Sequence, residues 1–221
     1  MLRALGDPLS FVLLVASFVV AATAHGWVQA LLTDHAGERR PRLEGRLLPD
    51  PRRHLDPFGV IAALIGGVGW AKPVELPPRS RRAAMVTVAL SGAVVNLVLG
   101  LLSLLVCRAL VGPVPADASI LENGIRGDLA SQAALLFGLM NLYVGVLSLV
   151  PLPPLDGGRL LFGLGPRTQG WQRAEYHLVE QNIGLVAVLV LLLLPLGGAQ
   201  ALLPQLLQTI VTPLVRLVTG G

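Results

Sequence analysis

The chain has 221 residues, of which 53% are hydrophobic and 14% are charged, and its mean hydropathy is +0.70. These values exclude an ordinary soluble domain and are typical of a membrane protein. All but one of the 17 basic residues are arginine, the charges lie between apolar runs, and only 5% of the residues are aromatic. We therefore attribute the net charge of +4 to membrane topology and expect no nucleic-acid partner.

The first apolar run covers residues 9–32. As a helix it would be roughly 36 Å long at about 1.5 Å per residue, which is enough to cross a bilayer. The alternative is a secretory signal, because Arg3 precedes the run and the small residues at 22–24 resemble a cleavage site just before His25. Since the apolar run continues beyond that site, we favour a retained span over a signal that is removed.

A basic segment follows at residues 34–82, with ten basic residues against six acids. It contains a glycine-rich apolar piece at 58–70, which has 13 residues and is too short for a comfortable span. We expect this piece to form a membrane-dipping hairpin or loop that is buried against protein. The positive-inside rule places the basic segment in the cytoplasm and the acidic loop at 112–130 outside.

The remaining apolar segments complete a single membrane-embedded domain that covers residues 1–221. The last segment has a polar side, so it is expected either to lie in the membrane interface or to cross the bilayer obliquely. The fold class is an all-α polytopic membrane protein. After the first run, its expected spans are residues 83–111, 131–150 and 183–196, and its amphipathic or oblique C-terminal helix is 200–218.

Two polar residues stand one helical turn apart at the end of the first run. His25 and Gln29 project from one face of a helix, and the alternation of spans puts Asp156 at a similar depth on the cytoplasmic side. This spacing is that of the two zinc-binding histidines in an HExxH helix. The simpler alternative for His25 is a hydrogen-bonding partner for a neighbouring helix, with Gln29 as its mate, and for Asp156 it is the N-cap of the next helix.

Four further motifs help to interpret the spacing of His25, Gln29 and Asp156. They are "GRLLPDPRRHLDPFG" at residues 45–59, "GWAKPV" at 69–74, "SGAVVN" at 91–96 and "PLPPLDGGR" at 151–159. With these motifs the sequence resembles the site-2 protease family of intramembrane zinc metalloproteases, in its compact bacterial branch, over most of the chain. The resemblance implies a site-2-protease-like helical core around a metal site.

Carried over position by position, the resemblance gives each site residue a counterpart. His25 corresponds to the first zinc histidine, Gly26 to the catalytic glutamate, Gln29 to the second zinc histidine and Asp156 to the zinc aspartate. Two of these four positions are altered. A metal site made of His25, Gln29 and Asp156 would therefore be vestigial or weak, and zinc as a cofactor is doubtful.

Other cleft candidates follow from the same motifs. Asn96 is retained in the "SGAVVN" helix, whereas Ala93 replaces the usual proline and Ser148 replaces a common substrate-contacting asparagine. His54 matches a histidine that the family often has in its loop, where we expect structural or gating use. With Gly26, the cleft candidates are therefore His54, Asn96 and Ser148.

Because Gly26 cannot take a proton from water, we expect no catalytic residue and a pseudoprotease that binds or regulates a membrane protein. One alternative is an active zinc metalloendopeptidase that carries out intramembrane proteolysis with a rearranged site. Another is a purely structural partner of another membrane protein. The expected location is the cell membrane, in several passes, with the vestigial site near the cytoplasmic side. The expected partners are the bilayer and a membrane protein or transmembrane peptide.

Overall fold

The computed structural model describes residues 1, 7–74, 81–113, 128–166, 168–195 and 201–220. Within these ranges the secondary structure is helical, apart from an isolated antiparallel bridge between Leu55 and Ala71. Four of the described helices are long and apolar enough to cross a membrane. The predicted fold class is thus confirmed: the chain is an all-α polytopic membrane protein.

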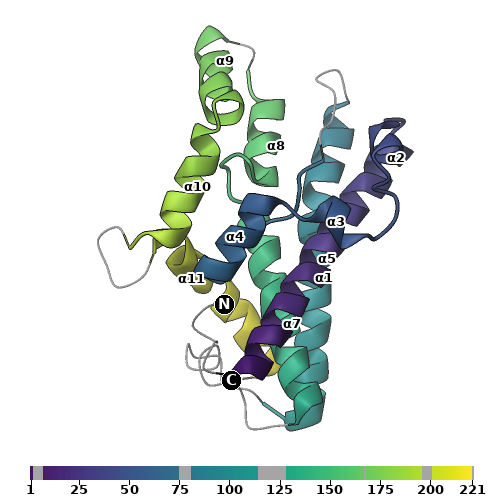
Figure 1. Cartoon of the computed structure of the whole chain (residues 1–221), viewed down its shortest axis with the longest axis vertical. Helices are drawn as coiled ribbons and strands as arrows, with labels where there is room; N and C mark the ends of the chain where they lie inside the picture. The colour runs from purple at the N-terminus through teal and green to yellow at the C-terminus, as the bar shows by residue number, and fades with distance from the viewer. Residues whose placement is uncertain (2–6, 75–80, 114–127, 167, 196–200, 221) are drawn as a thin grey trace.

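Three long helices form the centre of the molecule, and they run side by side along its long axis (Figure 1). They are α1 (Pro8–His35), α5 (Arg82–Val111) and α7 (Leu129–Ser148), whose bounds lie within three residues of the expected spans. In its most apolar window α7 is 61% buried, against 22% for α5. The innermost helix of the bundle is therefore α7, while α5 leaves most of its surface to lipid.

Small residues bring α5 and α7 into close contact. A Cβ atom added to Gly100 would lie 2.9 Å from the Gly138 carbonyl oxygen, and one added to Gly145 would lie 3.2 Å from that of Ala93. Association of helices within lipid depends on such close backbone approach. Helix α5 therefore packs closely against α7 at Ala93 and Gly100.

The first helix continues without a break through residues 22–24, where the alternative interpretation placed a signal cleavage site. Its N-terminal half belongs to the bundle, because Phe18 and Ala21 are buried and Ser10 Oγ accepts a hydrogen bond from Gln132 Nε2 of α7 at 3.1 Å. These contacts favour a retained span. Arg3 lies outside the described residues.

The expected span at 183–196 contains a shorter helix. Helix α10 (Ile183–Leu193) has only 11 residues, or roughly 16 Å at about 1.5 Å per residue, about half of a bilayer core. Asn182 in front of it has a φ of 57°, in the left-handed region, and ends the preceding helix pair. That pair is α9 (Gln169–Glu175) with η2 (Tyr176–Glu180), and it meets α10 at a bend of 63°. A span would need both parts together.

The last helix, α11 (Leu202–Thr219), corresponds to the expected C-terminal helix at 200–218. Every fourth residue from Leu203 to Val215 is buried, and this stripe packs on α5, α7 and α10. It is also one of the four helices that could span a membrane. Positions 200 and 196, like most of the acidic loop (114–127), lie outside the described residues.

The glycine-rich piece expected at 58–70 folds as a helix and a returning segment. Helix α4 (Pro57–Gly66) ends at Gly67 in the left-handed conformation, with a φ of 91°. The chain then runs back along α4 so closely that a Cβ atom on Gly59 would collide with the Trp70 carbonyl oxygen. Two short helices, α2 (Arg40–Leu43) and α3 (Pro51–His54), connect α1 to this hairpin.

Candidate functional site

A buried hydrogen bond joins residues that are 131 positions apart in the sequence. His25 Nε2 on α1 lies 2.7 Å from Asp156 Oδ2, and the two residues are only 2% and 8% exposed. Asp156 is the first residue of α8 (Asp156–Leu164). The N-cap interpretation is wrong, because Leu155 occupies that position and the carboxylate is directed to His25 instead.

The "SGAVVN" helix α5 supplies the opposite wall. Asn96 Nδ2 lies 3.3 Å from His25 Nδ1, and a Cβ atom on Gly92 would collide with the imidazole at Nε2. An amide nitrogen can only donate, so Nδ1 accepts from Asn96 and the proton lies on Nε2, which donates to Asp156. The ring of His25 is thus held at both nitrogens and against a glycine face.

Gln29 lies one turn further along α1 and is 1% exposed. Its Nε2 atom and the Oδ1 atom of Asn96 are buried without a hydrogen-bond partner in the described part of the chain. In the described part of the chain His25 bonds to Asp156 and to Asn96 on the neighbouring helix α5, and Gln29 is not its partner. Unpaired amide atoms in an apolar interior are costly.

The space beside Gly26 is filled by His54. A Cβ atom on Gly26 would lie 3.0 Å from His54 Nδ1 and 3.3 Å from His54 Cβ. The imidazole of His54 is fully buried, its Nε2 lies 2.9 Å from the Leu48 carbonyl oxygen, and its Nδ1 has no described partner. Burial lowers the pKa of His54 below its usual value. A longer side chain at position 26 would have to displace this ring.

Ser148 lies at the edge of the same region. It is 3% exposed, and its hydroxyl donates to the Gly145 carbonyl oxygen within α7 at 2.8 Å. A cavity of about 10 Å³ lies between His25, Asp156, Ser148 and Trp70. This volume is about that of one water molecule.

Two arginines were not among the predicted site residues, although both belong to the quoted motifs. Arg46 donates from its two terminal nitrogens to the carbonyl oxygens of Lys72 and Pro73, at 2.7 and 2.9 Å. Arg159 donates to the carbonyl oxygen of Val74 at 3.2 Å. These bonds hold the "GWAKPV" segment in place, and with it Trp70, which borders the same small cavity as His25 and Asp156.

A larger groove opens from the other side of Asp156. Its volume is about 500 Å³, and apolar side chains of α5 and α8 form most of its walls, together with Trp171. Among the described residues of its lining Asp156 is the one that is ionisable, and Asp156 also borders the small cavity at His25. The groove therefore leads from the surface of the bundle to the buried pair.

The donor set does not fit a catalytic zinc ion. Zinc sites of hydrolases use three His, Glu, Asp or Cys ligands and keep a fourth position for water. Here the described residues hold no group of three such side chains, and Gln29 contributes an amide. His25 Nε2 and Asp156 Oδ2 are hydrogen-bonded to each other at 2.7 Å.

Fold and site together define a class: a multi-pass helical membrane protein with a polar pair buried beside an apolar groove. The chain is 32% identical over 200 residues to "Putative zinc metalloprotease YwhC" of Bacillus subtilis (strain 168). The aligned residues cover 89% of this chain and 87% of that protein. The chain therefore belongs to this metalloprotease-like family. No protein-family model and no solved structure matches it.

The His25–Asp156 bond can be tested by removing its acceptor. Asp156→Ala would leave His25 Nε2 buried without a partner and should lower the free energy of unfolding by about 1–3 kcal/mol. Asp156→Asn keeps an acceptor oxygen and should lose less. Unfolding of the detergent-solubilised protein gives the measurement, with Glu180→Ala on the exposed end of η2 as control. Equal losses in Asp156→Ala and Glu180→Ala would contradict the assignment.

The packing of His54 on Gly26 gives a second prediction. Gly26→Glu should lower the free energy of unfolding by about 1–3 kcal/mol, because the glutamate must displace the His54 ring. In a His54→Ala background the same change should cost less, which a double-mutant cycle measures. Gly170→Glu is the matched control, since nothing lies within 4 Å of a Cβ atom there. A cost of Gly26→Glu that does not depend on residue 54 would refute this packing.

Proposed function

We propose that the chain is a site-2-protease-like membrane protein that has lost hydrolysis, a pseudoprotease that binds an apolar segment of another membrane protein. The observation that carries the proposal is the His54 ring packed on Gly26, at the position where the family places its catalytic glutamate. This packing accommodates a residue without a side chain at position 26. Gly26 itself offers no group that could take a proton from water.

The chemistry of the pair supports this conclusion. A positioned general base typically contributes about 10² to 10⁴ in rate. Gly26 has no side chain for this role, and the only free nitrogen of His54 is in a fully buried ring. Asp156 is already an acceptor for His25. Among the described residues of the site, no group stands ready to activate a water molecule against a peptide bond.

What remains is a binding surface. The groove of about 500 Å³ is mostly apolar, and Asp156 is in its lining. Peptide backbone in a membrane must satisfy its hydrogen bonds, so an unwound segment needs polar partners in the wall that receives it. An apolar side chain in the groove with a backbone N–H near Asp156 meets both requirements. The partner we propose is a transmembrane segment of another protein.

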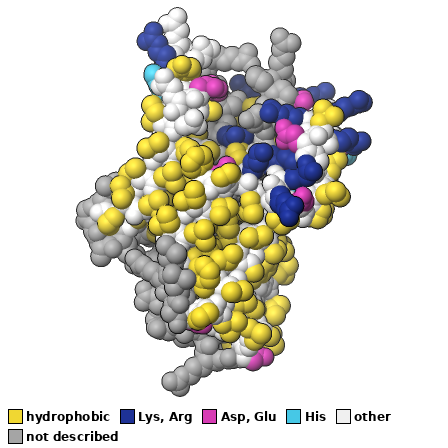
Figure 2. Space-filling view, in the orientation of Figure 1, with side chains coloured by type: hydrophobic (Ala, Val, Ile, Leu, Met, Phe, Trp, Pro, Cys, Tyr) yellow, Lys and Arg dark blue, Asp and Glu magenta, His cyan; other side chains and the backbone are white. Residues whose placement is uncertain are grey.

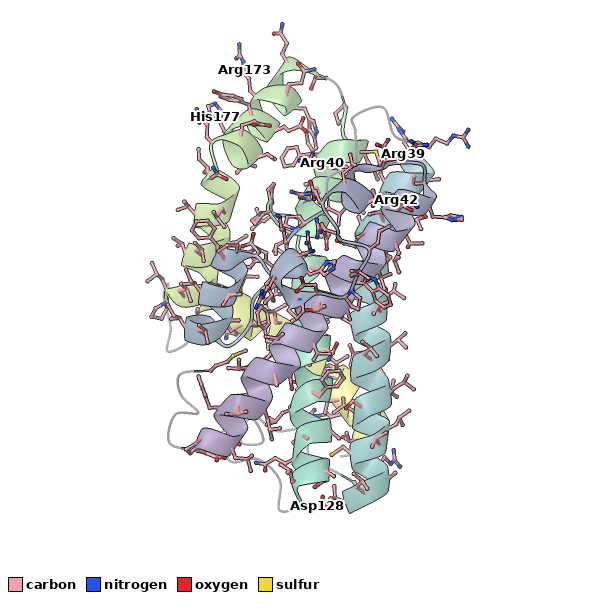
Figure 3. All side chains as sticks on the ribbon, turned by 45° about the vertical axis from the view of Figure 1, so that its right-hand side comes forward. Arg39, Arg40, Arg42, Asp128, Arg173 and His177 are labelled. Atoms are coloured by element: carbon pink, nitrogen blue, oxygen red, sulfur yellow. The ribbon has the colours of Figure 1, made fainter. Side chains whose placement is uncertain are left out.

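The distribution of charge sets the orientation. Arg39, Arg40 and Arg42 lie at one end of the molecule and Asp128 at the other (Figure 3). The positive-inside rule puts the arginine end in the cytoplasm of a cell. His25 lies ten residues before the end of α1, or about 15 Å along the helix axis. We thus place the pair in the cytoplasmic half of the cell membrane.

A second candidate function is zinc-dependent intramembrane proteolysis with a rearranged site. It is supported by the name of the relative and by the His25–Asp156 pair, which keeps two donors of the kind zinc prefers. The third candidate, a structural partner of another membrane protein, would use the lipid-facing side of α5 and would not need the groove.

Zinc content and cleavage together separate the first two functions. We expect purified protein to carry far less than one zinc ion per chain, with the same amount in His25→Ala, because the donor set is incomplete. We also expect no cleavage of a transmembrane reporter above the Asp156→Ala background. Elemental analysis and gel assays measure both quantities. Stoichiometric zinc that is lost in His25→Ala, with cleavage stopped by chelator, would establish the protease instead.

Binding in the groove separates the first function from the third. Leu90→Trp would fill the groove wall and should weaken binding of a fluorescent transmembrane peptide about tenfold, or about 1.4 kcal/mol. Val98→Trp is the matched control, because Val98 is also exposed on α5 but does not line the groove. Anisotropy in detergent micelles gives the affinities. Equal weakening by both substitutions would favour a partner on the lipid-facing side of α5.

A further inference from the structure

A strongly basic surface lies at one end of the molecule, apart from the His25–Asp156 pair. Six arginines and two acids lie between residues 39 and 53, in the segment that joins α1 to α4. We call residues 39–53 the arginine loop. Arg81 and Arg82 at the start of α5 add to its charge. Figure 2 shows these dark blue side chains gathered directly above the apolar belt of the bundle.

Ion pairs with the described residues involve only part of this charge. Arg40 pairs with Glu44 at 2.9 Å, and Arg42 pairs with Asp34 at 2.8 Å. Four other arginines are exposed and have no hydrogen bond or ion pair from their side chains to the described residues: Arg39, Arg52, Arg81 and Arg82. The surface thus presents an excess of positive charge that calls for an anionic ligand.

The arginine loop also exposes large apolar side chains between its charges. Leu43 is 85% exposed and Leu48 is 68% exposed, although both are in a part of the chain with well-defined backbone contacts. A surface for water alone, or for nucleic acid, would not need leucines among its arginines. Arginine beside exposed leucine is the composition of segments that lie in a membrane interface.

The position of the arginine loop along the molecule agrees with this composition. Helix α1 has 28 residues and is about 42 Å long, whereas the bilayer core is about 30 Å thick. Its last turns therefore reach the level of the lipid head groups, and the arginine loop begins four residues after α1 ends. The phosphates of one leaflet are at this level.

The depth of the arginine loop is fixed by hydrogen bonds to its backbone. Trp27 Nε1 on α1 donates to the Leu47 carbonyl oxygen at 2.9 Å, and His54 Nε2 lies 2.9 Å from that of Leu48. A third bond runs from Arg53 to the Glu44 carbonyl oxygen. The backbone at Leu47 is therefore tied directly to α1, and the backbone at Leu48 is tied to His54.

We propose that the arginine loop is a lipid-binding surface that takes anionic phospholipid head groups of the leaflet beside it. The four unpaired arginines contact the phosphates, and Leu43 and Leu48 insert among the upper parts of the acyl chains. The surface does not depend on the proposed pseudoprotease function, because none of its residues belongs to the groove or to the buried pair.

Depth of insertion is the property to measure. The variant Leu43→Cys in the full chain carries an environment-sensitive fluorophore, and the native Cys107 is buried and does not compete for the label. The labelled protein is placed in nanodiscs of phosphatidylcholine, alone or with phosphatidylglycerol, with bromine on the acyl chains as quencher. We expect quenching that increases with the anionic lipid and decreases with salt.

The charge requirement is tested by four substitutions made together: Arg39→Gln, Arg52→Gln, Arg81→Gln and Arg82→Gln. They should raise the phosphatidylglycerol needed for half-maximal quenching at least about tenfold, since each basic residue near a membrane surface attracts anionic lipid. Arg173→Gln is the matched control, because Arg173 is exposed at the same end of the molecule but on α9 (Figure 3). It should leave quenching unchanged.

Four results would overturn the proposal. Quenching that is equal without phosphatidylglycerol would mean that leucine contact alone holds the loop, and no quenching at all would mean that Leu43 faces water or protein. A loss of quenching in Arg173→Gln as large as in the fourfold variant would indicate a general charge effect. Displacement by inorganic phosphate or by a short RNA would assign the arginines to a soluble anion. Quenching that neither inorganic phosphate nor RNA reduces would support anionic phospholipid as the ligand.

Discussion

The structure depends on one buried polar contact in an apolar bundle, the hydrogen bond between His25 and Asp156. Neither side chain can be buried without a hydrogen-bond partner among helices that face lipid, because no water is present there to take the place of that partner. The contact ties the middle of α1 to the first residue of α8, across a gap of 131 positions in the chain. Asn96 and Gly92 on α5 are shaped around it.

Glycines make this arrangement compact, and they do so on two sides of one helix. Gly92 lets α5 rest on the His25 ring, and Gly26 lets His54 lie against the next residue of α1. The neighbouring backbone is then held by arginines rather than by sheet pairing, since Arg46 and Arg159 donate to three consecutive carbonyl oxygens from Lys72 to Val74. Glycine contacts and arginine hydrogen bonds thus hold the surroundings of the His25–Asp156 pair in place.

Hydropathy and charge were sufficient for the parts of the fold that a bilayer dictates. The bounds of α1, α5 and α7 and the shared depth of His25 and Asp156 follow from apolar length and from the alternation of spans. The short length of α10 could not be predicted in this way, because hydropathy does not reveal the left-handed backbone conformation of Asn182. Likewise, the contact of His54 with Gly26 depends on how a loop 28 residues away packs, which periodicity does not report.

Hydrogen bonds connect the arginine loop to the part of α1 that carries His25 of the buried His25–Asp156 pair. Leu47 is bonded to Trp27, two residues from His25, and Leu48 is bonded to His54, whose ring touches Gly26. His54 also accepts a hydrogen bond at its own carbonyl oxygen from the Lys72 amide at 2.7 Å, so it connects α1, the loop and the "GWAKPV" segment. His54 therefore links the packing at Gly26 of α1 to the backbone of the arginine loop and to the "GWAKPV" segment.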